Sequence, residues 1–140
     1  MSRYQRVNLD GKSVTETRIT AAALLPGTFA TIVSDEFTAA SAISGRMYVM
    51  NPAYHQGLDI DQAIPLGDSG VGEYVEDDRE LAIRVPAGTY AKDTPITLGT
   101  AGKGAIGTEG TDVILGYSQD EVTLTEEGVI RVRFRYVAVS

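Results

Sequence analysis

A serine and a histidine are the residues with the clearest potential for catalysis. Ser69 lies in the sequence Gly-Asp-Ser-Gly (67–70), and His55 is the only histidine in the chain. A serine nucleophile needs a histidine base and a third group that orients the base. The sequence offers no convincing orienting group for His55. We therefore expect no catalytic triad and interpret His55 as a loop or rim residue.

A glycine-rich stretch, GKGAIG (102–107), matches the G-x-G-x-x-G pattern of dinucleotide-binding proteins. That pattern binds pyrophosphate only where it joins a strand to the N-terminus of a helix. The residues that follow, TEGTDVILGY, indicate a turn and a strand instead, and Lys103 is not followed by the Ser or Thr of a P-loop. We predict a mobile loop here and no cofactor.

Carboxylates gather in two stretches, LDID (58–61) and EYVEDDRE (73–80). Neither has the spacing of a calcium-binding loop, although paired carboxylates could also serve a glycosidase. A β-hairpin that turns at residues 76–78 would place acidic residues at its tip simply because tips are solvated. We favour that interpretation, and we expect no metal site and no enzymatic activity.

The elements that position these residues are short runs of β-branched and aromatic residues, separated by Gly and Pro turns. Because helices do not alternate with them, the pattern predicts an all-β sandwich or barrel with at most one short helix. That helix is a candidate at 34–45, with Ser34 as its N-cap and Gly45 as its end. A strand and loop fit the same residues equally well. The predicted strands are 28–33, 46–50, 72–76, 80–85, 95–99, 112–117, 121–124 and 129–139.

Charge and composition narrow the possible partners. The chain has 140 residues, a net charge of -7 and no cysteine. The negative charge argues against nucleic-acid binding, because the phosphate backbone would repel the protein. No stretch has the length and apolarity of a membrane span or a signal peptide, so we expect no membrane partner and synthesis in a reducing cytoplasm.

The first twenty residues differ from the rest, because they are basic and lack a long apolar run. They carry Arg3, Arg6, Lys12 and Arg18. The composition fits a disordered tail or an extended arm that becomes ordered on a partner. We therefore divide the chain into an N-terminal arm (1–20) and a β-domain (21–140).

Three of the nine arginines lie within five residues at the C-terminus. Arg131, Arg133 and Arg135 alternate with apolar residues, so a strand would place them on one face and the apolar residues on the other. The arginines have three possible roles: they solvate or protect the sheet, they pair within the chain, or they pair with a neighbouring subunit or capsid. The acidic partners considered within the chain are Glu73, Glu76 and Glu80.

Several segments, taken in order, resemble the capsid decoration proteins of tailed bacteriophages. They are AALLPGTFATI (22–32), GRMYVMNP (45–52), GLDIDQAIPLGDSG (57–70) and LAIRVPAGTYAKDTPITLG (81–99), followed by a glycine-rich stretch and a closing strand. The chain departs from the family in the charged EDDRE turn and in the three C-terminal arginines. These departures leave open which group of decoration proteins it is most similar to.

The resemblance implies a virion protein on the outer capsid surface that clamps neighbouring major capsid proteins and associates with itself as a dimer or trimer. A basic arm could add to a sheet edge of its partner, which makes basic residues at both ends contact candidates. An alternative is a glycan-binding β-module of a virion or secreted assembly. The contact candidates are Arg3, Tyr4, Arg6, Arg18, Arg131, Arg133 and Arg135.

Overall fold

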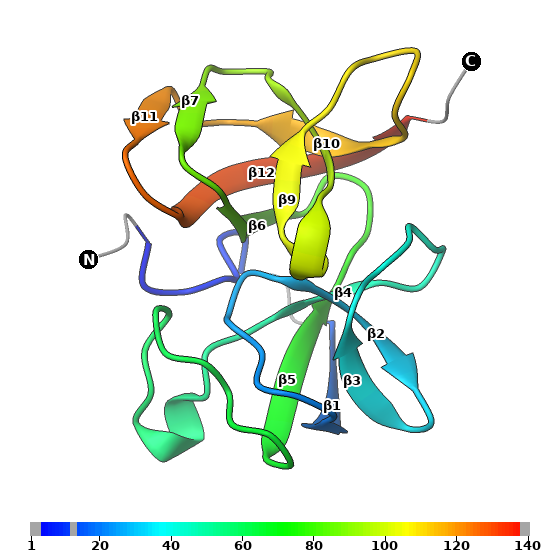
Figure 1. The fold of residues 1–140 in the computed structure, drawn as a ribbon, viewed down its shortest axis with the longest axis vertical. Coiled ribbons are helices and arrows are strands. Elements are labelled where there is room, and N and C mark those ends of the chain that lie inside the picture. Colours follow the sequence, from blue (N-terminus) through cyan, green and yellow to red (C-terminus); the bar gives the residue numbers. More distant parts are fainter. Residues whose placement is uncertain (1–3, 12–13, 138–140) are drawn as a thin grey trace.

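The computed structural model describes residues 4–11 and 14–137. These residues form twelve β-strands, two short 3-10 helices and no α-helix, which confirms the predicted all-β class. Figure 1 shows two halves stacked along the long axis, with β1–β5 in the lower half and β6–β12 in the upper half. No helix in the described residues is long and apolar enough to cross a membrane.

The lower half is a closed barrel with the strand order β1-β3-β2-β4-β5. Phe37, Tyr48 and Met50 fill its interior. They leave no room for a side chain at Gly72, where a Cβ atom would lie 2.8 Å from the Cβ atom of Tyr48. The strands are β1 (Thr15–Thr20), β2 (Phe29–Val33), β3 (Glu36–Ala39), β4 (Tyr48–Met50) and β5 (Ser69–Tyr74), and the 3-10 helix η1 (Tyr54–Gln56) lies between β4 and β5.

The upper half contains a five-stranded sheet with the order β6-β12-β10-β8-β9 and a two-stranded ribbon of β7 and β11. In β12, Ile130, Val132 and Phe134 are buried while Arg133 and Arg135 are exposed, so the predicted alternation is confirmed. The elements are β6 (Glu80–Val85), β7 (Gly88–Tyr90), β8 (Pro95–Leu98), η2 (Thr100–Gly102), β9 (Gly104–Ile106), β10 (Ile114–Ser118), β11 (Val122–Leu124) and β12 (Gly128–Val137).

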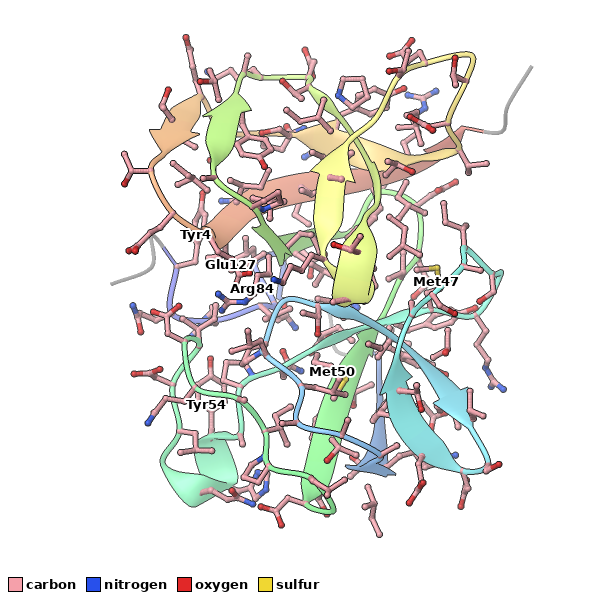
Figure 2. The ribbon with its side chains drawn as sticks, in the orientation of Figure 1. Tyr4, Met47, Met50, Tyr54, Arg84 and Glu127 are labelled. Carbon is pink, nitrogen blue, oxygen red and sulfur yellow. The ribbon has the colours of Figure 1, made fainter. Side chains whose placement is uncertain are left out.

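The two halves pack against each other through a shared core. Phe29 of β2 meets Phe134 of β12 edge to face, with the ring centroids 6.0 Å apart. Arg84 of β6 is buried at the same junction and donates hydrogen bonds to the carbonyl oxygens of Pro26 (2.9 Å) and Ile60 (2.6 Å). Figure 2 shows Arg84 beside Glu127 between the two halves. The halves therefore form one packed unit.

The N-terminal residues differ from the predicted arm, because much of this stretch is built into the fold. Residues 15–20 are strand β1, which is paired with β3 and β5. Upstream, Val7 is 0% exposed and belongs to the shared core. Asn8 forms an antiparallel bridge with Leu81, so residues 7–9 cover the edge of β6. Residues 7–9 are held in place by the burial of Val7 and by pairing with β6, although the composition of this stretch is compatible with disorder.

Residues 34–45 form a turn, strand β3 and a loop, and they do not form the alternative helix. Ser34 and Asp35 form the two-residue turn between β2 and β3, with φ values of 50° and 66°. Positive φ at both positions is typical of type I′ hairpin turns. Val33 pairs with Glu36 across this turn, and the next residue, Phe37, is buried inside the barrel. The residue considered as a helix N-cap is therefore part of a hairpin turn.

Two further predictions differ from the structure. Residues 76–78 are not the tip of a hairpin, because β5 belongs to the barrel and β6 to the upper sheet. The predicted loop at 102–107 contains strand β9. Its glycines allow close packing: a Cβ atom at Gly104 would lie 2.9 Å from Cγ2 of Ile83. Lys103 forms an ion pair with Glu127.

Candidate functional site

A buried ionic cluster connects the N-terminal segment, the barrel and the upper sheet. Arg79 is 0% exposed and donates to Glu73 Oε1 at 2.9 Å and to Asp10 at 3.3 Å. It also donates to the carbonyl oxygen of Tyr74 at 3.0 Å. Burial lowers the pKa of Arg79, but its hydrogen bonds with Asp10 and Glu73 outweigh this effect and leave the pKa raised. The guanidinium group therefore stays charged and holds three segments together.

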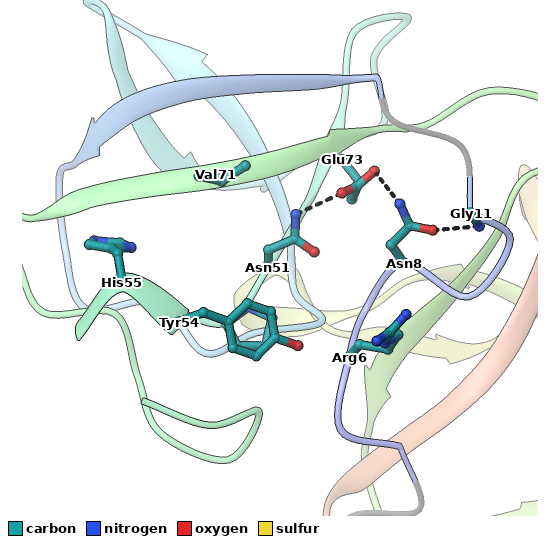
Figure 3. A pocket seen from close by; sticks show the side chains of 9 residues that line it. Arg6, Asn8, Gly11, Asn51, Tyr54, His55, Val71 and Glu73 are labelled. Carbon is teal, nitrogen blue, oxygen red and sulfur yellow. Dashed lines mark hydrogen bonds between the residues drawn. The ribbon is translucent and has the colours of Figure 1, made fainter. Parts of the chain in front are cut away.

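The same cluster supports the floor of an open cleft of about 480 Å³. Glu73 accepts a hydrogen bond from Asn51 at 2.8 Å and one from Asn8 at 3.4 Å (Figure 3). The cleft lies between the N-terminal segment, residues 51–55 and the outer face of β5. Tyr54, His55 and Arg6 line its rim, so the predicted contact residue Arg6 belongs to this cleft.

Tyr54 holds a fixed position at the cleft. Its hydroxyl group donates to the carbonyl oxygen of Gln5 at 2.7 Å, although the residue is 55% exposed. Partial burial raises the pKa of this hydroxyl group, and the charge of Arg6 opposes the rise. The sequence pattern alone does not single out Tyr54. Its position directly before the only histidine, in a turn outside every predicted strand, is the signal that could have identified it.

The arginines of β12 lie on a surface that includes Glu80 of β6. Arg133 is directly opposite Glu80 in the strand pairing, and both Arg131 and Arg133 form ion pairs with that carboxylate. Arg135 is exposed and lines a shallow depression with Tyr117. We call Arg131, Arg133, Arg135 and Tyr117 the arginine surface. Pairing within the chain therefore accounts for two of the three arginines.

The N-terminal segment reaches this arginine surface. The Tyr4 hydroxyl group donates to the Asp120 carboxylate at 2.8 Å, and the Arg131 backbone N–H donates to the same carboxylate at 2.9 Å. The Glu80 N–H donates to Asp10 at 2.8 Å. The fold thus brings together Tyr4, Arg131 and Glu80, which are far apart in the sequence.

The remaining predicted residues lie elsewhere. Arg18 pairs with Glu16 at 3.0 Å and with Asp35 at 2.9 Å on the barrel, away from the upper sheet. Of the three acidic partners considered for the C-terminal arginines, Glu80 pairs with Arg131 and Arg133, Glu73 pairs with Arg79, and Glu76 is exposed. Arg3 lies outside the described residues. Within residues 4–11 and 14–137, no three His, Asp or Glu side chains are placed to share a metal ion.

The Glu80 pair predicts a pH dependence of stability. Burial raises the pKa of Glu80, but hydrogen bonds from Arg133 and Arg131 outweigh it and hold the pKa below its ordinary value of 4.5. A lowered pKa stabilises the fold above pH 4.5, and this stabilisation is lost as the pH falls through the folded-state pKa. We expect the stability advantage of the wild type over Glu80→Gln to be at most about 1 kcal/mol near neutral pH and to shrink in acid.

Urea unfolding measured as a function of pH tests this expectation. Glu76→Gln is the matched control, because this exposed carboxylate lies in the connection between β5 and β6, shortly before Glu80 begins β6. An advantage over Glu80→Gln that stayed constant in acid would contradict the assignment of the ion pairs.

Comparison with known proteins gives a likeness in fold. No family model matches the chain, and no curated protein matches it. Among solved structures, it is similar to the N base of the head fiber gp8.5 of bacteriophage phi29, with a TM-score of 0.59. The alignment covers 87% of this chain and 93% of the other, at 11% sequence identity. The chain shares its fold with a phage head-fiber base. At this identity the likeness concerns the arrangement of strands.

Proposed function

We propose that this chain is a structural protein of a phage head that binds the outer capsid surface and stabilises contacts between major capsid proteins. The observation that carries the proposal is the likeness to the phi29 head-fiber base over 87% of the chain, which spans both halves of the molecule. The order of the decoration-protein segments in the sequence supports the same conclusion independently.

The arginine surface is the proposed contact with the capsid. Arg135 is exposed, and Arg133 shares Glu80 with Arg131. Arginine binds carboxylates bidentately and is less strongly hydrated than lysine, so it suits a contact that excludes water. The Tyr4–Asp120 hydrogen bond anchors the N-terminal segment beside this surface. Many copies on a closed shell would make weak individual contacts collectively strong. This function requires no catalysis, and we propose that the chain has none.

Mass spectrometry of purified virions tests the proposed function directly. We expect the chain to be abundant beside the major capsid protein in virions of the phage that encodes it. Mild treatment that strips the chain while leaving the heads intact would place it on the outside. Its absence from the virions would overturn the proposal.

Substitution of two arginines tests the contact surface. We expect Arg133→Gln/Arg135→Gln to weaken retention on heads by about 2 kcal/mol or more, or roughly thirtyfold, because truncating one partner of a desolvated pair leaves the other charge unpaired. The melting temperature should change little, since exposed ion pairs contribute only about 0 to 1 kcal/mol to folding. Retention is measured by sedimentation of heads as the salt concentration is raised.

Arg46→Gln is the matched control, because this exposed arginine lines a depression on the barrel with Thr15 and Tyr74 and is not part of the arginine surface. Equal loss of retention in the control and the double variant would argue for a general charge effect. Unchanged retention in the double variant would exclude the arginine surface as the contact.

A further inference from the structure

The cleft beside Tyr54 combines an apolar wall with an exposed aromatic ring. Pro52, Val71 and Tyr54 supply the apolar surface, and the Tyr54 hydroxyl group is held by the Gln5 carbonyl oxygen at 2.7 Å. A tyrosine fixed in this way can offer its ring to a ligand with little further loss of side-chain freedom. The cleft volume, about 480 Å³, falls in the range of roughly 300 to 1,000 Å³ that is typical of small-molecule sites.

The polar floor of the cleft is preorganised. Asn51 donates its amide N–H to Glu73 at 2.8 Å, and Glu73 is in turn held by the buried Arg79 at 2.9 Å. This chain of hydrogen bonds fixes the orientation of the Asn51 amide group and turns its Oδ1 atom away from Glu73 (Figure 3). Oδ1 accepts no hydrogen bond from the residues that the structure describes, so it is available to a hydroxyl donor.

The rim provides the complementary donors. Arg6 and His55 line the cleft on either side of Tyr54 (Figure 3). Both are exposed, and neither forms an ion pair within residues 4–11 and 14–137. A ligand that lies on the Tyr54 ring can therefore meet an acceptor at the floor and donors at the rim.

We infer that this cleft binds a neutral saccharide, with one hexose or N-acetylhexosamine ring against Tyr54. The C–H face of a pyranose ring suits the apolar wall, and its hydroxyl groups both donate and accept. The ligand is expected to be uncharged because the Glu73 carboxylate lies at the floor of the cleft and because the chain carries a net charge of -7. This inference does not depend on attachment to a phage head.

An extended peptide fits the cleft less well. Strand β5, which forms the cleft floor, pairs with β1 on one side and with β4 on the other. It has no open edge to which a peptide backbone could add. Binding must therefore come from side chains, which suits a compact polyhydroxylated ring. A single such site is expected to bind at millimolar concentration, and multiple copies would strengthen attachment to a glycan surface.

The test is an NMR titration of the full ¹⁵N-labelled chain with glucose, galactose, mannose and N-acetylglucosamine at millimolar concentrations. At least one sugar is expected to cause saturable shifts of the Asn51, Tyr54 and His55 amides. Tyr54→Ala should weaken binding about tenfold through loss of the ring, whereas Tyr54→Phe should retain most of the affinity. Ile106→Ala is the matched control, because Ile106 is 52% exposed on β9, in the other half of the molecule.

Three outcomes overturn the inference. No saturable shift with any of the four sugars excludes the ligand class. Shifts confined to residues away from the cleft exclude the site. Tighter binding of glucuronate or inorganic phosphate at the same amides identifies an anion site around Arg6. If Tyr54→Ala fails to fold, the Tyr54→Phe and Ile106→Ala affinities and the mapped shifts still decide the question. If the chain binds to phage heads but binds none of these sugars, the saccharide site is refuted while the proposed function stands.

Discussion

Replacing Arg79 by alanine is expected to lower the free energy of unfolding by about 3 to 5 kcal/mol, because it leaves a buried carboxylate without its partner. Glu73 is only 3% exposed, and Asn8 and Asn51 remain as its hydrogen-bond donors. Neither amide carries a positive charge that could replace the guanidinium group. The variant also loses the bond to the Tyr74 carbonyl oxygen, so the connection between β5 and β6 is affected as well.

Urea unfolding followed by circular dichroism measures this loss. Arg133→Gln is the control, because it removes an arginine from an exposed ion pair and should cost about 0 to 1 kcal/mol. The double variant Arg79→Met/Glu73→Gln should recover part of the lost stability, since it removes the two most deeply buried charges of the cluster. An Arg79→Ala variant as stable as the Arg133→Gln control would contradict the buried ionic cluster.

Deletion of residues 1–20 is expected to abolish cooperative folding. It removes strand β1, which closes the barrel against β3 and β5, and it removes Val7 from the shared core. A barrel that loses one of its five strands exposes two edges and its interior. If residues 1–20 were a disordered tail or a separate arm, their deletion would leave the β-domain folded. The ¹H–¹⁵N correlation spectrum of the truncated chain distinguishes the two outcomes.

Point variants test how much the individual residues within 1–20 contribute to the free energy of unfolding. Val7→Ala should cost about 1 to 3 kcal/mol, because Val7 is 0% exposed. Val14→Ala should stay within about 0.5 kcal/mol, because Val14 is 43% exposed. A dispersed, native-like spectrum of the truncated chain would show that the barrel does not require β1.

The parts of the fold that the sequence predicts well are strands with strong alternation or dense apolar residues. In β12, the buried residues Ile130, Val132 and Phe134 are each followed by an arginine, so the period of two is clear over residues 130–135. The sequence predicts a strand over residues 80–85, and these are the bounds of β6 in the structure. The sequence does not distinguish the three possible roles of the C-terminal arginines. The distinction depends on which strand lies beside β12, and the structure shows that it is β6, which carries Glu80.

The parts that could not be predicted owe their structure to distant partners. Strand β1 has the sequence TETRIT, which is polar, and it is a strand because β3 and β5 bind both of its edges. Strand β3 follows two residues with positive φ that have no glycine to mark them. Arg79 stands among acidic residues in the sequence, and nothing there separates a buried arginine from a solvated one. Only the fold brings Asp10 to it.

The hydrogen bond between Tyr4 and Asp120 has a consequence for the order in which the chain assembles. These residues are separated by 116 positions, and Val7 belongs to a core cluster that includes residues of both β6 and β12. During synthesis on the ribosome the first residues emerge long before the last strand exists. The N-terminal segment can pair with β6 once residues 80–82 have been made, whereas the bond from Tyr4 can form only after Asp120 has been made. Such non-local closure is typical of slow-folding β-proteins. The contact between Tyr4 and Asp120 would then be among the last contacts of the fold to form.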